Sequence, residues 1–589
     1  MELELKEQLL GHKKIPFPLL MKHCWKYIKK ELGALIGSAI LTIINVFLSS
    51  IIPIFAQRVV ENLQSTNIIL TMVISYAVGI LVLTIVNEVI LYFESMILQK
   101  AGQRIVLRLR VDVFEHVENM SLNQLTAMPV GSLVTRVANY TESMSDLFTN
   151  TLVNVIRNVL TIVVVYGIMF FISPKLSLIM LIFVAVLFGI SYVFSKIVSK
   201  QFRKERDAIS DLNTFVNENV SGMKIIQLFN KEKRKLEDFR VKNEKYRKIR
   251  YGVVLCFAAY RPLIALIHML AVAVSFWSGI SLLLTGGEII AFYLLLSRFF
   301  NPVQNLADQL NNIQRAMSAC EKLFNLMDIE PEVVDAEDAI EVERFKGKIE
   351  FKNVWFAYEN EDWILKDVSF VVEPGQTVAF VGPTGVGKTT ILSLIVRNFE
   401  INKGQILIDD IDIKKIKIKS LRKAIGQMLQ DVFLFSGTIK DNITLFDDSY
   451  SDDDVIEVCN YVNAFSFIEK SEKGIYEEVI ERGENYSTGQ RQLISFARTV
   501  LAMPQILILD EATANIDTET EHLIQEALYK MKSIGTMLIV AHRLSTIQHS
   551  DQIFVLNNGR IAESGKHQEL LRKKGIYYKL YELQFKNKQ

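Results

Sequence analysis

The chain has few cysteines and almost no net charge. Its 589 residues include only four cysteines, which lie far apart and form no CxxC pair. This spacing argues against a zinc knuckle or a dithiol redox site, and we expect buried free thiols. Lysine and arginine number 66 against 65 aspartate and glutamate residues, which leaves a net charge of +1. There is no global basic field, so nucleic acid is not an expected partner. The four cysteines are Cys24, Cys256, Cys320 and Cys459.

Apolar residues, in contrast, are abundant. Half of the residues are hydrophobic and the mean hydropathy is +0.23, which is too apolar for an ordinary soluble protein. They concentrate before about residue 310, whereas the rest of the chain alternates charged and apolar segments. We therefore expect a membrane part followed by a soluble α/β part.

Five uncharged stretches are long enough to cross about 30 Å of hydrocarbon as helices. In a sixth stretch, residues 289–306, Arg298 and Asn301-Pro302 interrupt the apolar run, so we expect a weaker span that is kinked or faces a watery interior. An even number of spans places both termini on the same side of the membrane. The five stretches are residues 33–56, 68–87, 158–174, 176–195 and 262–287.

Basic residues set the expected orientation. They cluster before the first span and in the long loop after the fourth, so both segments should be cytoplasmic. The chain is then a multi-pass protein of the cytoplasmic membrane, with both termini and the soluble part in the cytoplasm. The residues are Lys13, Lys14, Lys22, Lys26, Lys29 and Lys30, then Arg203, Lys204, Arg206, Lys231, Lys233, Arg234 and Lys235.

The two long cytoplasmic loops, about 93 to 150 and 196 to 255, have apolar residues at helical spacing, which predicts that the spans continue as rods. Met128-Pro129-Val130-Gly131 and Asn219-Val220-Ser221-Gly222 predict turns or short transverse helices at their far ends. Plain turns and a contact site are equally compatible with these residues.

Three charged residues lie in or beside the apolar spans. Charges in hydrocarbon are costly, so Glu88, Arg157 and Arg298 are candidates to line a central cavity. The alternative is that Glu88 and Arg157 lie near the inner headgroups and snorkel toward them.

A glycine-rich loop is the most specific motif of the soluble part. The run Gln376–Val381 predicts a strand before it, and Ile391–Val396 predicts a helix after it. In such a loop the amides attract phosphate oxygens, Lys388 reaches the β and γ phosphates, and the Thr389 hydroxyl ligates Mg²⁺. The loop consists of Gly382, Pro383, Thr384, Gly385, Val386, Gly387, Lys388, Thr389 and Thr390.

Polar residues end three further apolar strands. Asp510 follows Gln505–Leu509 and can orient the hydration shell of Mg²⁺, while Glu511 can polarise the attacking water as catalytic base. His542 follows another apolar run and can hydrogen-bond the γ-phosphate. Gln430 can reach Mg²⁺ or the water in the same way.

A second anion-seeking helix start occurs at Ser487, Thr488, Gly489 and Gln490. The first loop already serves one nucleotide, so this second site is useful only if it faces a nucleotide held by another subunit. The sequence therefore predicts a dimer.

These residues resemble the ATP-binding cassette (ABC) transporters, specifically half-size exporters with one six-span membrane domain and one nucleotide-binding domain. The resemblance implies a multi-domain fold, a polytopic all-α membrane domain plus an α/β P-loop domain. It implies residues 1–330 as the membrane domain, 331–347 as a linker and 348–589 as the nucleotide-binding domain. It also assigns roles: Tyr358 stacks on adenine, Gln430 is the Q-loop, Ser487–Gln490 the signature, Asp510 and Glu511 Walker B, Asp517 the D-loop and His542 the switch histidine.

The resemblance also implies a transport mechanism. Two cassettes would sandwich two ATP molecules head to tail, and closure would drive export of an amphipathic, drug-like or lipid-like cargo through the membrane. A peptide exporter or lipid flippase of the same fold, or a nucleotide-gated channel, are the alternatives. The signature here has Thr488 where the family's usual Leu-Ser-Gly-Gly-Gln has glycine, which predicts a heterodimer with one impaired site. A homodimer remains the alternative.

Overall fold

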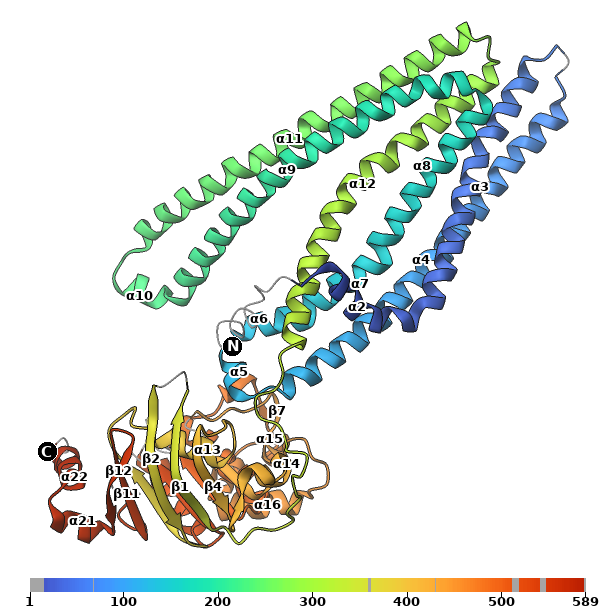
Figure 1. Cartoon of the computed structure of the whole chain (residues 1–589). Coiled ribbons are helices and arrows are strands. Elements are labelled where there is room, and N and C mark those ends of the chain that lie inside the picture. Colours follow the sequence, from blue (N-terminus) through green and yellow to red (C-terminus); the bar gives the residue numbers. More distant parts are fainter. Residues whose placement is uncertain are drawn as a thin grey trace. The chain divides into compact units, whose positions relative to one another are not determined.

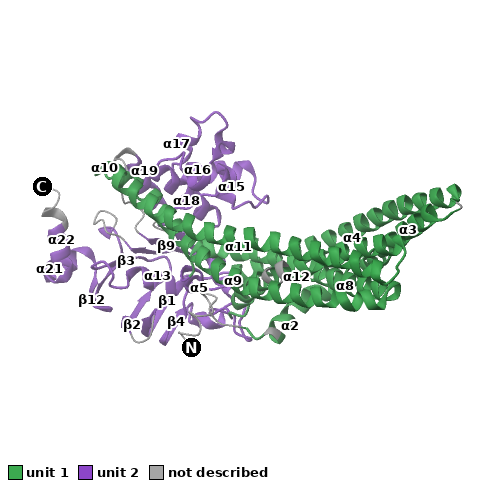
Figure 2. Ribbon diagram, turned by 90° about the horizontal axis from the view of Figure 1, so that it is seen from above, with its two compact units in different colours: residues 1–118, 128–329 green, residues 119–127, 330–589 purple. Residues whose placement is uncertain are grey.

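The computed structural model describes residues 15–66, 68–358, 362–428, 431–510, 518–540 and 547–586. They form two compact units (Figure 2). Unit 1 runs to Glu118 and resumes as Met128–Ile329, and unit 2 joins Asn119–Ala127 to the chain from Glu330 onward. Within the described residues, unit 1 is entirely helical and every strand lies in unit 2. A helical membrane domain and an α/β domain are the fold that the sequence predicts.

Long helices joined by tight turns build unit 1 (Figure 1). Helices α3 and α4 lie side by side, as do α9 and α11. The helices are α2 (Phe17–Ile28), α3 (Leu32–Gln64), α4 (Leu70–Glu118), α6 (Val130–Thr135), α7 (Thr141–Asp146), α8 (Leu152–Ile172), α9 (Pro174–Ser221), α10 (Met223–Leu228), α11 (Glu232–Ser281) and α12 (Gly286–Met327).

Local sequence sets several helix ends. Ser173 is the N-cap of α9 and Pro174 its first residue, where a missing N–H costs nothing. At the start of α12 the Thr285 hydroxyl accepts from the Glu288 amide, and the Glu288 carboxylate accepts from the Thr285 amide. This capping box satisfies amides that the helix leaves unpaired.

One bound of the predicted spans is wrong. Helix α11 ends at Ser281, and residues 282–285 make the turn, so the fifth span stops before Gly287. The predicted sixth span lies within helix α12, which continues through Pro302. A membrane-spanning helix tolerates proline when neighbouring groups satisfy the freed carbonyl. Among the described residues, five helices meet a simple length-and-hydropathy test, and α12 is not one of them.

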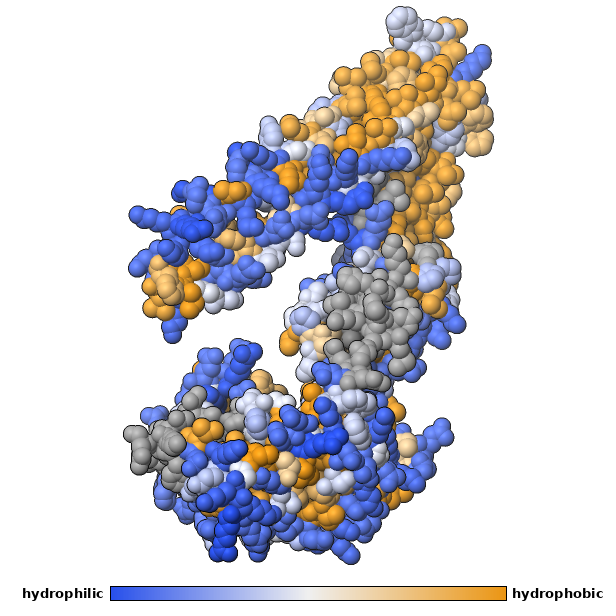
Figure 3. Space-filling model, turned by 60° about the vertical axis from the view of Figure 1, so that its left-hand side comes forward, coloured by the Kyte–Doolittle hydropathy of each residue, from blue (hydrophilic) through white to orange (hydrophobic). Residues whose placement is uncertain are grey.

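The predicted rods are confirmed. Helices α4, α9 and α11 have 49, 48 and 50 residues, far more than about 20 needed to span a bilayer. The arm of α9, α10 and α11 is largely hydrophilic before its tip, the tip itself carries an apolar patch, and apolar residues cover the opposite end of unit 1 (Figure 3). The two predicted turns lie beside short helices, α5 (Leu122–Thr126) and α10.

Two sheets form the core of unit 2. The strand orders are β12-β11-β3-β10-β9-β6, in which only the β11–β12 pair is antiparallel, and β2-β1-β4-β5, which is antiparallel throughout. Every residue of β3, β9 and β10 is buried, as continuous apolar runs predict for central parallel strands. The strands are β1 (Ile349–Ala357), β2 (Trp363–Val372), β3 (Thr377–Val381), β4 (Lys403–Ile408), β5 (Ile411–Asp412), β6 (Ile425–Met428), β9 (Ile506–Asp510), β10 (Thr536–Val540), β11 (Gln552–Asn557) and β12 (Arg560–Gly565).

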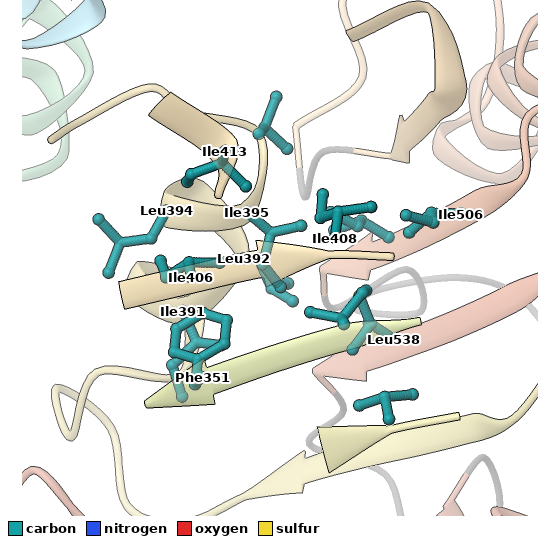
Figure 4. Packing of buried hydrophobic residues seen from close by; sticks show 14 of the residues in the cluster. Phe351, Ile391, Leu392, Leu394, Ile395, Ile406, Ile408, Ile413, Ile506 and Leu538 are labelled. Atoms are coloured by element: carbon teal, nitrogen blue, oxygen red, sulfur yellow. The ribbon is translucent and has the colours of Figure 1, made fainter. Parts of the chain in front are cut away.

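Helix α13 (Lys388–Ile395) lies in the core that the two sheets share (Figure 4). Its Ile391 and Leu394 are fully buried with Phe351 of β1 and Leu538 of β10. The glycine-rich loop therefore leads into a helix that is fixed by both sheets. The other helices of the unit are α14 (Ile418–Ala424), α15 (Ile439–Thr444), α16 (Asp452–Tyr461), α17 (Phe465–Ile468), α18 (Thr488–Leu501), α19 (Thr518–Met531), α21 (His567–Lys573) and α22 (Ile576–Lys586).

The segment after α12 is tied into unit 2 at two places. The Gln124 amide of α5 donates to the Glu330 carbonyl at 2.8 Å. The Arg397 guanidinium, buried just beyond α13, donates to the Val334 carbonyl at 2.9 Å. A short stretch from the membrane half of the sequence thus belongs to the nucleotide-binding unit, which hydropathy alone does not indicate.

Candidate nucleotide-binding site

The parallel strands bring the predicted site residues to one edge of the sheet. Val540 of β10 pairs with Asp510 of β9 on one side and with Phe380 of β3 on the other. These strands run in the same direction, so their carboxyl ends align, and ligands of open α/β sheets bind at that edge. The glycine-rich loop leaves β3 at this level.

Two glycines of the loop adopt a left-handed backbone. Gly385 has φ of 81° and Gly387 has φ of 101°, both unfavourable for other residues. A Cβ atom on Gly387 would lie 2.7 Å from Cδ2 of Leu365, so the loop also passes too close to β2 for a side chain. Pro383 and Thr384 are exposed at the tip and Val386 is half-buried. The chain thus wraps over the start of α13, where unpaired amides attract phosphate.

Lys388 is folded back over this loop. Its ammonium donates to the carbonyl oxygens of Gly382 and Pro383, both at 2.9 Å, and the side chain is almost wholly buried. A largely buried cation is strongly attracted to an incoming polyphosphate, because two formal charges interact far more strongly in low dielectric.

Thr389 faces the acidic end of β9. Its hydroxyl donates to Oδ1 of Asp510 at 3.3 Å, and the Asp510 carboxylate is largely buried. A hydroxyl and a carboxylate at this spacing fit the hard oxygen donors that Mg²⁺ prefers. When bound, the ion neutralises phosphate charge. Thr389 and Asp510 are therefore the described residues that would hold Mg²⁺.

Tyr358 lies beside the loop. Its hydroxyl lies 3.0 Å from the hydroxyl of Thr390, and its ring makes edge contacts with Phe356 and Phe399. The side chain is 43% exposed, so part of an oriented aromatic ring remains open to a purine base. The structure therefore brings the predicted Tyr358, loop residues and Asp510 into one site.

Four predicted site residues lie outside the described residues: Gln430, Glu511, Asp517 and His542. The strands that precede them are described. Met428 of β6 pairs with Leu509 of β9, and β9 and β10 end at Asp510 and Val540. The roles expected for the four residues remain predictions.

The predicted signature begins α18. The Ser487 hydroxyl accepts from the Gln490 amide at 3.2 Å, and the Gln490 side chain accepts from the Ser487 amide at 2.9 Å. Gly489 is buried, whereas Thr488 is exposed and its hydroxyl accepts from Nη2 of Arg491 at 3.3 Å. Figure 2 shows α18 among α15, α16 and α17, away from α13. The two anion-seeking helix starts therefore do not converge within one chain.

A partly buried arginine, Arg498, connects α18 to the segment that precedes it in the sequence. The Arg498 guanidinium donates to the carbonyl oxygens of Asn442 at 2.7 Å and Phe433 at 3.2 Å. Burial lowers the pKa of Arg498 from its ordinary value. Arg498 thus links α18 to the segment after Gln430, and no sequence pattern indicates this link, because only the fold shows which carbonyls the guanidinium meets.

The three charged candidates of the membrane unit do not form one cluster. Arg157 of α8 is hydrogen-bonded to the carboxylate of Glu94 on α4, which also accepts from the Thr42 hydroxyl at 2.8 Å. Arg298 of α12 donates to the Ser49 carbonyl. Glu88 is exposed, and among the described residues no ion pair joins it to either arginine. Glu94 was not among the predicted residues, although the signal that singled out Glu88, an acid beside an apolar span, also applies to it.

Comparisons with known proteins identify the family. Residues 35–303 match the family described as "ABC transporter transmembrane region", and residues 365–514 match "ABC transporter". A Bacillus subtilis (strain 168) relative, "Probable multidrug resistance ABC transporter ATP-binding/permease protein YheH", is 37% identical over 86% of this chain and 76% of its own. An "ATP-dependent lipid A-core flippase" of Syntrophus aciditrophicus (strain SB) is 34% identical over 84% of this chain and 83% of its own.

A solved ABC exporter structure has a similar fold. The "Structure of a bacterial Atm1-family ABC exporter with ATP bound" superposes with a TM-score of 0.79 and 26% identity, over 95% of this chain and 98% of that one. The chain belongs to the ABC transporter family. It is a multi-pass membrane exporter that binds ATP, couples ATP hydrolysis to transport and works as a dimer.

Proposed function

We propose that the chain is one half of a dimeric exporter that moves an amphipathic, drug-like or lipid-like substrate outward across the cytoplasmic membrane. The observation that carries the proposal is the union, in one chain, of an all-helical membrane unit with a phosphate loop whose Thr389 meets Asp510. Relatives named for multidrug resistance and lipid A-core flipping support an amphipathic cargo. Basic residues before α3 and within α9 and α11 support cytoplasmic termini and a cytoplasmic nucleotide-binding unit.

Within the site, the residues have distinct tasks. Lys388 and the loop amides bind the β and γ phosphates, and Tyr358 orients the base. Thr389 would ligate Mg²⁺, Asp510 would orient its hydration shell, and Gln430 would reach the ion or the attacking water. Glu511 takes the proton of the attacking water, and His542 binds the γ-phosphate. Asp517 belongs to the loop that faces the partner cassette.

The partner is proposed to be a different half-transporter. In a head-to-tail dimer the signature of this chain completes the partner's ATP site, so the exposed Thr488 side chain stands where backbone must approach phosphate. The Arg491 guanidinium donates to the Thr488 hydroxyl, and this hydrogen bond orients the Thr488 side chain. The chain therefore supplies the phosphate loop and acidic residues of the competent site, and the partner's signature completes that site. The signature of this chain impairs the other site.

ATPase assays of the reconstituted protein test the proposal. A panel of dyes, lipids and peptides is added to the chain alone and to the chain co-expressed with a half-transporter that is encoded next to it. We expect little ATPase from the chain alone and amphipathic stimulation of the pair. Cooperative, robust ATPase from a homodimer would refute the heterodimer, whereas stimulation by polar peptides alone would refute the substrate class.

A further inference from the structure

A pocket lies where the N-terminal helix meets α4 in unit 1. It has a volume of about 270 Å³. Helix α2 and the turn after it contribute one wall, and one and a half turns of α4 contribute the other. The lining residues are Lys26, Tyr27, Lys30, Leu107, Arg108, Val111 and Asp112.

Cations outnumber carboxylates around this pocket. Asp112 is already bound by the Lys26 ammonium and the Tyr27 hydroxyl, both at 2.9 Å. The buried Glu31 is shared by Arg104 at 3.3 Å and Arg108 at 2.8 Å. That leaves one arginine charge and the exposed Lys30 uncompensated by these carboxylates. The Nη1 atom of Arg108 is also buried without a hydrogen-bond partner among the described residues.

With the orientation proposed above, the pocket lies at the level of the cytoplasmic headgroups. Glu31 directly precedes the uncharged run that starts α3 at about Gly33, so its pairing with Arg104 and Arg108 marks where that span begins. Trp25 on α2 is 51% exposed, a position typical of a membrane–water interface. Helix α2 buries Leu20, Cys24 and Ile28 and exposes its lysines, as an interfacial helix does.

The α4 wall continues as an apolar strip. Leu107 and Val111 line the pocket and are 65% and 54% exposed, and Phe114 is exposed one turn further along the same face. One side of the pocket thus offers excess positive charge and the other offers apolar contact. Free phosphate would use only the first feature, whereas a phospholipid uses both.

We propose that this pocket binds the headgroup of an anionic phospholipid of the cytoplasmic leaflet. The phosphate lies against Lys30 and Arg108, whose charge these carboxylates leave in excess, with Lys26 beside them, and the lipid body follows Leu107 and Val111. Such a site lies in unit 1 and shares no residue with the nucleotide-binding site.

Native mass spectrometry of the full chain in detergent tests the proposal, with phosphatidylglycerol and phosphatidylcholine of identical acyl chains as probes. We expect preferential retention of phosphatidylglycerol. The double variant Lys26→Gln/Lys30→Gln should weaken that retention about thirtyfold, since each lysine near a lipid surface contributes on the order of 1 kcal/mol. Phosphatidylcholine retention should not change.

Matched variants separate the pocket from general charge. Lys22→Gln/Lys29→Gln removes two exposed lysines of the same segment that do not line the pocket, and should leave retention unchanged. Lys26→Arg/Lys30→Arg should preserve it and shows that loss is not misfolding. Equal retention of the two lipids, an equal effect of the control pair, or displacement by millimolar inorganic phosphate would each overturn the proposal.

Discussion

The Thr389 hydroxyl lies 3.3 Å from Oδ1 of Asp510, although the two residues are 121 positions apart in the sequence. Thr389 is in the first turn of α13, and Asp510 ends the buried strand β9. The parallel pairing of β9 with β10, and of β10 with β3, creates the contact. This pair marks the point at which the phosphate loop meets the acidic end of the sheet.

Lys388→Ala should abolish nucleotide binding or turnover. The ammonium that now donates to the Gly382 and Pro383 carbonyls is the main cation available to the β and γ phosphates. Binding of a fluorescent ATP analogue and phosphate release by the purified complex measure the effect. Undiminished ATPase in this variant would disprove the assignment of the loop.

Glu511→Gln should retain ATP binding but lower hydrolysis by about 10²–10⁴-fold, because the amide keeps the shape of the side chain and loses the base. The same binding and phosphate-release assays separate the two effects. Normal turnover would mean that another residue takes the proton.

Gly387→Ala should damage the loop even though the change is one methyl group. The residue has φ of 101°, which costs roughly 1–2 kcal/mol for an alanine, and its Cβ would lie 2.7 Å from Leu365. Gly385→Ala is the matched control, since its φ of 81° carries the same backbone cost but its Cβ meets no atom within 4 Å. We expect a larger loss of ATP affinity for Gly387→Ala; equal losses would show that backbone strain alone matters.

Arg157→Met should destabilise the membrane unit by about 3–5 kcal/mol, because it leaves the fully buried Glu94 carboxylate without its cation. Thermal unfolding of the purified protein in detergent measures the loss. The double variant Arg157→Met/Glu94→Gln should recover much of the stability. If the double variant were as unstable as the single one, the ion pair would not be the cause.

Thr488→Gly should improve the ATP site that this chain's signature completes. The effect is cleanest in a Glu511→Gln background, where turnover by the co-expressed complex comes only from the other site. We expect turnover to rise several-fold with Thr488→Gly and not with Thr488→Ser, which keeps a side chain at this position. No change with Thr488→Gly would remove the physical basis for an impaired site.

Much of this arrangement follows from sequence because its signals are local. Continuous apolar runs predict β3, β9 and β10, and glycine spacing predicts the loop, since positive φ and close packing require glycine there. The signature sequence likewise shows Thr488 at the position where glycine is usual.

Other features depend on contacts between distant segments and could not be predicted. Glu94 is buried only because α3, α4 and α8 enclose it, and its partners Thr42 and Arg157 come from two of those helices. The continuity of α12 through Pro302 contradicts a local rule, because neighbouring helices stabilise a span that proline alone would break. The tie of α5 to Glu330 also needs the folded unit.

Transport into inside-out membrane vesicles tests the central claim most directly. Vesicles containing this chain and its co-expressed partner are given an amphipathic fluorescent dye with ATP and Mg²⁺, and dye concentration inside is compared with that outside. An ATP-driven exporter predicts accumulation above the external concentration, which is lost with Glu511→Gln. Dye that only equilibrates, equally in both proteins, would contradict a pump and indicate a nucleotide-gated channel.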